Sequence, residues 1–599
     1  NIHRHRMMGT ELREAILVGS TEIAFPALVS ALVLTIVFVP VGLLGGVARY
    51  LFIPLALAVV FAILSSYVLS RTLTPAMAHW LLRHEPHEDE NAPPKNGFDR
   101  LHKGFNRGFE NLRQRYAKAL EWNLAHRATA LAAMILVVVG TSAVVPFVGR
   151  EFFPTVDAGQ IRMHVRAPTG TRIERTEQIF SAVENEVRAL IGSDVALILD
   201  NIGQPAVKYS MAFGDSVTVG THDGEVLIAL TPDRQRTAPE WMQVLRTELP
   251  KKFPDLDFYF QPADIVSQIL NFGLPAQINV KVVGFKRVEN FALAQQLKNK
   301  IAAIPGAVDV TLHQTNDLPT LKVEVDRSRA LELGITQRDV ANDLLVTLSG
   351  SGTVAPNFWM DPVSGNPYRI AVQLPEREMA SVESLASTPV SVANGPVQLL
   401  GNLGSVSRSV GPSVISHYNV QPSYDLFVSV AGRDLGAVAA DLDQVLDEAR
   451  TQLQPGNRIE LKGTVTAMRE AFSRLGFGLL GAAVLVYLLM VLNFQSWRDP
   501  FIVLTALPAA GAGVIWGLWL TGTYFSVPAL MGAIMTIGLA TANSILLVTF
   551  ANQRMEVGLD SFAAALDAGA TRLRPVLMTA GAMLIGMVPM ALGLGDGGE

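Results

Sequence analysis

Long apolar runs near both ends of the chain enclose a central stretch in which apolar and polar residues alternate. No charged residue lies between Glu22 and Arg49, between Arg49 and Arg71, or within residues 501–553. A helix of ~20 apolar residues is long enough to cross a bilayer. The pattern therefore predicts seven membrane spans: two within residues 23–80, one at 128–149, and four within 475–599 with a turn at 521–525.

Residues 150–474 instead alternate between short strands and amphipathic helices, which is typical of a water-exposed domain. Two sets of elements follow the order of the split ferredoxin-like plan, βαββαβ. We expect a polytopic α-helical membrane protein with a large α+β domain built of ferredoxin-like βαβ subdomains, with an insertion at about 336–401. The elements are expected at 160–166, 172–190, 196–201, 225–230, 238–249 and 257–260, and then at 277–283, 289–304, 308–313, 426–431, 435–453 and 458–461.

The two ends of the chain resemble one another. Residues 554–595 align with residues 5–46 without a gap, and this alignment pairs Pro26 with Pro575. Duplicated sets of helices are common in transporters. An apolar helix precedes the second copy but nothing precedes Asn1, so we expect the chain to be truncated at its start. It ends at Gly-Asp-Gly-Gly-Glu without a closing element, and we expect truncation there as well.

The basic residues of the short loops all fall on one side of the membrane if every span crosses it. Residues 1–22 are interpreted as the end of a truncated helix and a cytoplasmic amphipathic segment. Residues 81–127 are interpreted as a cytoplasmic linker and a basic surface helix around Arg107. Lys and Arg are enriched in cytoplasmic loops, so the domain at 150–474 is predicted to lie on the opposite, periplasmic side.

Composition narrows the class of protein. Of the 599 residues, 49% are apolar and 17% are charged, and the mean hydropathy is +0.31, which is too apolar for an ordinary soluble enzyme. The net charge of −5 gives no reason to expect nucleic-acid binding, and the absence of cysteine excludes disulfides and thiolate metal sites. No P-loop, dinucleotide-binding fingerprint in context or zinc-protease motif occurs. Neither an enzyme nor ATP-driven transport by this chain is expected.

Few polar residues in the predicted spans could take part in proton transfer. Thr541 and Asn543 lie within residues 501–553, and Asn543 would either hydrate a proton path or only bind a neighbouring helix. Arg572 and Thr579 are seven residues apart and share a helix face. Arg572 would either influence a carboxylate or be an interfacial arginine that extends to the membrane surface. No Asp or Glu lies within a complete span, so a proton-driven pump would need carboxylates upstream of this chain.

Two further groups of residues carry weaker signals. Three histidines near a charged linker could bind a metal ion, but nothing fixes their geometry and no metal site is predicted: His79, His84 and His87. Three residues before the strand at 225–230 either line an adaptable apolar substrate pocket or belong to an ordinary core: Tyr209, Met211 and Phe213.

Several motifs, in the same order along essentially the whole chain, resemble those of resistance-nodulation-division (RND) efflux permeases. Gly149-Arg-Glu-Phe-Phe-Pro-Thr-Val-Asp-Ala-Gly-Gln, followed by Ala167-Pro-Thr-Gly-Thr, resembles the start of the second periplasmic loop of that family. Asn1-Ile-His-Arg resembles the end of its fourth helix, and Arg572-Leu-Arg-Pro-Val-Leu-Met-Thr579 resembles its eleventh helix. On this resemblance the chain extends from the end of helix four through helix eleven.

The resemblance implies a homotrimeric drug/proton antiporter of the bacterial inner membrane, joined to a periplasmic membrane-fusion adaptor and an outer-membrane channel. It implies no cofactor, because the proton motive force drives export. The βαβ units would form the porter subdomains, and the insertion would dock the partners. Arg572 and Thr579 match positions of the family's proton relay. Ala542, beside the matching Asn543, stands where many drug-pumping members have lysine.

The resemblance leaves the substrate class open in part. The heavy-metal branch of the family typically has a carboxylate in the helix of Ala542 and a methionine ladder, and the sequence has neither. This favours the hydrophobe/amphiphile efflux branch and small amphiphilic substrates. Two alternatives remain. One is a lipid or envelope-component exporter of the same superfamily. The other is a non-transporting scaffold that has lost proton coupling, and Ala542 is the residue that keeps this alternative open.

Overall fold

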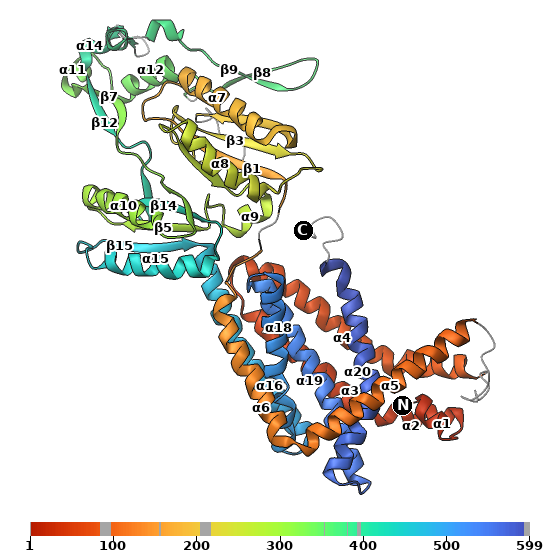
Figure 1. The fold of residues 1–599 in the computed structure, drawn as a ribbon. Coiled ribbons are helices and arrows are strands. Elements are labelled where there is room, and N and C mark those ends of the chain that lie inside the picture. The colour runs from red at the N-terminus through yellow and green to blue at the C-terminus, as the bar shows by residue number, and fades with distance from the viewer. Residues whose placement is uncertain are drawn as a thin grey trace.

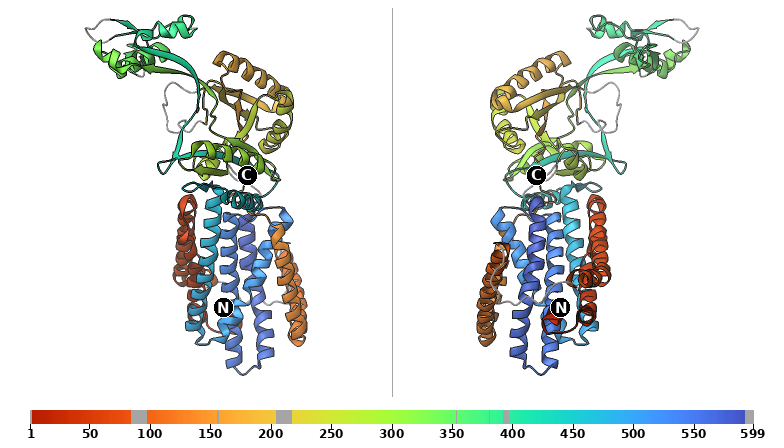
Figure 2. Two further views of the ribbon diagram at one scale, coloured as in Figure 1. Left: turned by 90° about the vertical axis from the view of Figure 1, so that its left-hand side faces the viewer. Right: turned by 90° about the vertical axis from the view of Figure 1, so that its right-hand side faces the viewer.

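The computed structural model describes residues 2–83, 97–154, 157–203, 217–352, 354–379, 381–391 and 397–591. Long helices form a bundle, and a domain of sheets and helices extends from one end of it (Figure 1). Two further views show the same separation, with the sheets beyond the end of the helices (Figure 2). The protein is a helical membrane protein with a large α+β domain, so the predicted fold class is confirmed.

The bundle forms where charged residues are absent over lengths that suit a bilayer. Among the described residues, six helical runs are long and apolar enough to cross a membrane. They are Leu12–Leu43, Gly46–Leu82, Arg127–Phe147, Thr464–Phe494, Arg498–Thr521 and Val527–Glu556. The seventh predicted span begins within a further long helix, Ser561–Ala591, and the predicted end of that span lies outside the described residues.

One helix, α19 (Val527–Glu556), lies at the centre of the bundle because it contacts α3, α16, α18 and α20. The other helices of this region are α1 (Ile2–Met7), α2 (Leu12–Glu22), α3 (Ala24–Val37), α4 (Gly46–Leu82), α5 (Gly97–Ala125), α6 (Arg127–Val144), α16 (Thr464–Phe494), α17 (Arg498–Leu504), α18 (Leu507–Thr521) and α20 (Ser561–Ala591).

The first α+β subdomain has the predicted βαββαβ order. Its elements are β1 (Gln160–Arg166), α7 (Ile173–Ile191), β2 (Val195–Ile202), β3 (Asp223–Leu230), α8 (Ala238–Lys252) and β4 (Asp257–Gln261). The strands are antiparallel in the order β2-β3-β1-β4. Alternate residues of a strand share a face, so Ile161, Met163 and Val165 on β1 pack in one core with Phe180 on α7 and Leu245 on α8.

The second subdomain repeats this plan with a long interruption. Its elements are β5 (Ile278–Val283), α10 (Arg287–Ala302), β6 (Ala307–Leu312), β14 (Gln421–Val430), α15 (Leu435–Arg450) and β15 (Arg458–Gly463). β14 pairs with both β5 and β6, and β5 also pairs with β15. Short elements accompany it: α9 (Ile265–Leu270) precedes β5, and β13 (Ser416–Tyr418) pairs with β14. β15 leads directly into the membrane helix α16.

The inserted unit is larger than the predicted residues 336–401. It is carried on a two-stranded ribbon of β7 (Leu318–Val325) and β12 (Gly404–Gly411). Its own small core includes Ile335 and Leu403, which lie outside the predicted bounds. In both ribbon strands apolar and polar residues alternate, as they do in the strands of the subdomains. This alternation does not reveal which sheet a strand joins. Within it are α11 (Arg327–Glu332), α12 (Gln337–Ser349), β8 (Asn357–Met360), β9 (Pro367–Ile370), α13 (Val382–Ala386), β10 (Pro389–Val390), β11 (Gln398–Leu399) and α14 (Leu400–Leu403).

Candidate functional site

The predicted membrane site depends on α19, which packs closely against α3. A Cβ atom placed on Gly538 would lie 3.0 Å from Leu34 Cδ2, so the two helices approach each other at a glycine. Thr541 and Ala542 are buried in the next turn of α19, and Asn543 is partly buried. The structure therefore places these residues inside the bundle.

The hydrogen bonds of this segment stay within the helix. The Thr541 hydroxyl donates to the Ile537 carbonyl at 2.8 Å, and the Ser544 hydroxyl donates to the Ala540 carbonyl at 2.8 Å. The Asn543 side chain makes no hydrogen bond to any residue that the structure describes. Thr541 and Asn543 are therefore not bonded to another described helix.

Arg572 lies at the contact between α20 and α19. Its guanidinium carbon is 4.9 Å from the centroid of the Phe550 ring, and that of Arg554 is also 4.9 Å from the same centroid. A cation over an aromatic face is attracted by the ring quadrupole. Arg554 Nε is in turn 2.7 Å from a carboxylate oxygen of Asp567, which lies on α20 one to two turns before Arg572.

A small polar cavity adjoins Arg572 between α2, α3, α19 and α20. Its volume is about 10 Å³, and its lining includes Glu22, Gln553 and Arg572. A cavity of this size holds about one water molecule. Glu22 Oε2 is 3.1 Å from His5 Nε2. A carboxylate and a guanidinium thus line one water-sized space, and the sequence prediction missed Glu22 because it immediately precedes the first uncharged run.

The other predicted site residues are not brought to this cavity. Thr579 is exposed, and its hydroxyl donates to the Val576 carbonyl at 2.9 Å, two turns beyond Arg572 on the same helix. His79 is exposed near the end of α4. Five predicted residues lie outside the described residues: His84, His87, Tyr209, Met211 and Phe213.

A second polar site occupies the sheet of the first subdomain, on the face opposite its core. β1 and β3 place Arg166 across from Asp223, and Arg166 Nη2 is 3.2 Å from Asp223 Oδ2. His164 also contacts the Asp223 carboxylate, and His164 and Asp223 are fully buried. Burial alone would raise the pKa of Asp223, but the cationic form of His164 and Arg166 outweigh it and lower the pKa to about 2.

These charges extend to the second subdomain. Arg166 Nη1 donates to the Leu312 carbonyl of β6 at 3.2 Å. Arg246 on α8 forms a bidentate pair with Asp309, with its Nη2 2.7 Å and its Nε 3.0 Å from the carboxylate. Burial lowers the pKa of His313, just after β6, to about 4, and the nearby Arg166 adds to the effect. The two subdomains are therefore joined by buried polar contacts.

A groove lies beside this junction, between α8 and β4 of the first subdomain and α10 and β6 of the second. Its volume is about 350 Å³. Apolar and charged residues of both signs line it: Pro250, Phe258, Tyr259, Val308, Val310 and Thr311, with Arg246, Lys298, Asp257 and Asp309. Pockets for small organic molecules are commonly apolar with a few placed polar groups.

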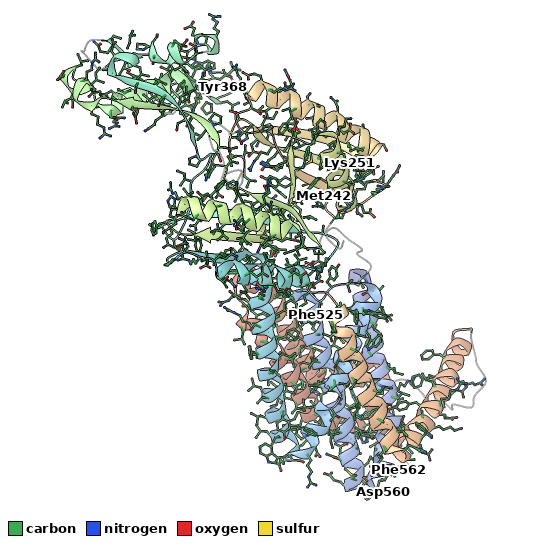
Figure 3. The ribbon with its side chains drawn as sticks, turned by 60° about the vertical axis from the view of Figure 1, so that its left-hand side comes forward. Met242, Lys251, Tyr368, Phe525, Asp560 and Phe562 are labelled. Carbon is green, nitrogen blue, oxygen red and sulfur yellow. The ribbon has the colours of Figure 1, made fainter. Side chains whose placement is uncertain are left out.

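A third site joins the bundle to the α+β domain. Residue Phe525, between α18 and α19, lies at this boundary, whereas Asp560 lies at the opposite end of the bundle (Figure 3). The Glu151 backbone N–H donates to the Phe525 carbonyl at 3.1 Å, and the Glu151 carboxylate accepts from the Leu435 N–H at 3.3 Å, at the start of α15. Burial raises the pKa of Glu151 to about 7, and the nearby Asp434 adds to the rise.

A partial signal for the sheet site was present in the sequence. Arg162, His164 and Arg166 occupy one face of the predicted first strand, and Asp223 and Glu225 occupy one face of the third. Such a strand carries polar residues on one face and apolar residues on the other, which suggests solvent on the polar face. The structure instead covers that face with the second subdomain, and this packing was not predictable from periodicity.

Comparison with known proteins gives consistent results. A family described as the AcrB/AcrD/AcrF family matches residues 1–599. The cation efflux system protein CzcA of Alcaligenes sp. (strain CT14) is 27% identical over 609 residues, covering 100% of this chain and 54% of that protein. The multidrug resistance protein MdtC of Shigella flexneri is 26% identical over 609 residues, covering 100% of this chain and 55% of that protein.

A solved structure has the same fold. The crystal structure of a heavy metal efflux pump, in crystal form II, superposes with a TM-score of 0.78 at 22% sequence identity. The match covers 100% of this chain and 56% of that one. This chain thus spans about half the length of the relatives it matches.

Proposed function

This chain belongs to the AcrB/AcrD/AcrF family of efflux permeases, and we propose that the protein exports hydrophobic or amphiphilic compounds in exchange for protons. The protein would act in the bacterial inner membrane with its α+β domain in the periplasm. It would assemble as a homotrimer with a membrane-fusion adaptor and an outer-membrane channel. The inserted unit, at the end of the molecule far from the bundle, is the natural place for these partners to dock (Figure 1).

The groove between the two subdomains is the observation that supports this substrate class. Phe258, Val308 and Val310 give it apolar walls, and charged residues of both signs, including Lys298 and Asp257, add polar groups. A molecule with an apolar body and a polar end suits such a lining. The described residues include no group of three or more His, Cys, Asp or Glu side chains arranged to hold a metal ion.

Proton coupling is supported by the cavity beside Arg572. Arg572 packs against Phe550 of the membrane helix α19, and ionisable residues packed among membrane helices are expected to have a function. Glu22 and Arg572 line the same water-sized cavity at one end of α19. Binding or release of a proton by the Glu22 carboxylate would change the electrostatic field at Arg572. This change would alter the contact between α19 and α20. The predicted relay roles of Arg572, Thr579, Thr541 and Asn543 belong to this proposal.

Export of divalent cations is the second candidate, because a relative at 27% identity is described as a cation efflux protein. The buried His164 and Asp223 are chemically suitable ligands. Arg166, however, lies 3.2 Å from the Asp223 carboxylate and would repel a bound cation. The structure therefore favours amphiphiles over cations as cargo.

The two candidates can be separated by tolerance measurements in a bacterium that lacks its main drug and metal exporters. The gene would be expressed with its adaptor and channel genes and tested against a panel of amphiphilic drugs and against zinc, cobalt, nickel and cadmium salts. We expect tolerance to several drugs to rise and to return to the baseline when a protonophore is added. A rise confined to the metal salts would select cation export, and unchanged tolerance to both would reject both candidates.

A further inference from the structure

The helix α5 (Gly97–Ala125) lies at the end of the bundle opposite the α+β domain. It connects the spans α4 and α6 and runs crosswise to the bundle helices (Figure 1). α5 ends at Ala125, and α6 begins at Arg127 after the single residue His126. Because α5 joins directly to the end of a span, it lies at the depth where the bilayer changes from hydrocarbon to headgroups.

One face of α5 is fixed to α20. Arg574 Nη2 on α20 donates to Asn106 Oδ1 at 3.0 Å, and the Arg574 guanidinium lies 5.3 Å from the centroid of the Phe109 ring. A Cβ atom added to Gly569 of α20 would lie 2.4 Å from Leu120 Cδ2, so the helices are in close contact there. α5 is thus a packed element of the bundle.

Beside this contact, part of the apolar face of α5 is uncovered. Phe105 is 66% exposed and Leu112 is 48% exposed, and their spacing of seven residues places both on one side of the helix. Trp122 is 55% exposed near the end that joins α6, on the side of the helix that also carries Arg115 and Lys118. Tryptophan is enriched at membrane interfaces because its ring is apolar while its N–H can be hydrated. These side chains match the boundary of a bilayer.

The polar face of α5 carries exposed basic residues. Arg107 and Lys118 are eleven residues apart, which is three turns, and Arg115 lies on an adjacent strip. All three are exposed, and none forms an ion pair with a residue in the part of the chain that the structure describes. Arg113 differs, because its Nη1 is 3.2 Å from Glu110 Oε2.

We propose that α5 is a lipid-binding element and that Arg107, Arg115 and Lys118 bind the phosphate groups of anionic phospholipids. The apolar face positions the helix in the interface, and the long basic side chains extend from it to the headgroups. Each basic residue close to an anionic membrane surface strengthens binding about fivefold. A zwitterionic headgroup carries no net charge and lacks this attraction.

Lipid binding at α5 would reach the membrane site through α20. Asn106 and Leu120 hold α5 to Arg574 and Gly569, and Arg572 lies on the same stretch of α20. Anionic lipid would therefore restrain the helix that carries Arg572. The binding itself does not depend on the proposed transport function, since it concerns only the protein and the bilayer.

The test measures lipid preference in bilayers of known composition. The purified chain would be reconstituted with phosphatidylcholine containing a small fraction of spin-labelled phosphatidylglycerol or spin-labelled phosphatidylcholine, and the protein-bound fraction of each label would be measured. We expect a preference for phosphatidylglycerol that weakens as salt is added. In the triple variant R107Q/R115Q/K118Q this preference should be at least about tenfold weaker, because each basic residue strengthens binding about fivefold.

Two control variants make the result specific. R107K/R115K/K118R keeps the charges and should retain the preference. R172Q/R188Q/K251Q removes the same charge from exposed positions of the α+β domain and should also retain the preference. Equal binding of the two labels by the wild type, or an unchanged preference in R107Q/R115Q/K118Q, would overturn the proposal. Equal competition by soluble glycerol phosphate would also overturn it, because the ligand would then be a free phosphate ester and not the membrane.

Discussion

The contact of α19 with α3 in the membrane bundle and the contact between the two α+β subdomains differ in how they use polar groups. In α19 the hydroxyls of Thr541 and Ser544 donate to carbonyls of the same helix. In the α+β domain Arg166 and Arg246 bond across the boundary between two subdomains. The contact of α19 with α3 therefore depends on the apolar shape of the two helices and on close approaches such as Gly538. Between the subdomains specific charge pairs contribute directly to the contact.

This difference indicates which contacts allow the elements to slide and which open only when buried charges change. Helices that pack through small and apolar residues, as α19 and α3 do, can slide without breaking a hydrogen bond between them. A subdomain contact that contains buried charges opens only if those charges are hydrated or neutralised. Changes in protonation are therefore expected to act more strongly on the α+β domain and on its joint with the bundle than on the interior of α19.

The largest effect is expected from breaking the Arg246–Asp309 pair. Asp309 is nearly fully buried and Arg246 mostly so, and R246A would leave the carboxylate without its partner. Removal of one member of a buried pair costs roughly 3 kcal/mol or more. We expect R246A to lower the melting temperature of the purified protein and to increase hydrogen exchange in β6.

Lys251 supplies the matched control on the same helix. Lys251 Nζ is 2.8 Å from Glu248 Oε1, but both side chains are exposed. K251A should change stability by less than ~1 kcal/mol. If R246A and K251A had the same small effect, the proposed contribution of charge pairs to the subdomain contact would be wrong.

A smaller effect is expected when pH acts on His313. Its pKa in the folded protein is about 4, below its ordinary value of 6.5, so the folded state favours the neutral ring. The stability from this site is complete above pH 6.5 and decreases as the pH falls towards 4. At pH 5 the loss is on the order of 2 kcal/mol. Charged and titratable groups of both subdomains face the ring: Arg166, Asp425, Asp223 and His164.

Crosslinking between the subdomains would measure this response. The chain has no cysteine, so one introduced pair across the groove reports on that contact alone. We expect crosslinking at pH 5 to be weaker than at pH 7 in the wild type and equal at the two pH values in H313Q. The exposed His79 provides the control, since H79Q should retain the wild-type response. A wild type without a pH response would contradict the assignment.

Glu151 should respond to pH in the opposite direction. Its folded pKa of about 7 lies above the ordinary value of 4.5, so the folded state favours the protonated acid. The contribution of Glu151 to stability is greatest below pH 4.5 and decreases as the pH rises through 7. E151Q removes this cost and should stabilise the protein at pH 8 by about 1–2 kcal/mol, with little change at pH 4.5. Thermal unfolding at the two pH values would measure the difference, and destabilisation at pH 8 would disprove it.

The sequence predicted elements more reliably than contacts between them. Uncharged runs identified the spans, and alternation identified both βαββαβ units, because these patterns depend on local burial. The bounds of the insertion were wrong, since the strands of its carrying ribbon look like subdomain strands. The roles of Glu151, Asp309 and His313 were missed because each depends on a partner distant in sequence: Leu435, Arg246 and Arg166. The polar face of the first strand was a usable signal for the sheet site, but alternation alone does not show that a second subdomain covers that face.

The smallest effect on stability is expected at Thr541. Substitutions there distinguish a role of this side chain in packing from a role in a proton path. Its hydroxyl bonds only to the Ile537 carbonyl, so T541V removes one hydrogen bond within a helix. Even hydrogen bonds between membrane helices contribute only about 0.6 kcal/mol on average, so the melting temperature should hardly change. If Thr541 belongs to a proton path, T541V should still slow proton-coupled export, whereas T541S, which keeps the hydroxyl, should not. Equal export by T541V and T541S would limit Thr541 to packing against α3 and would locate proton transfer at the Glu22–Arg572 cavity instead.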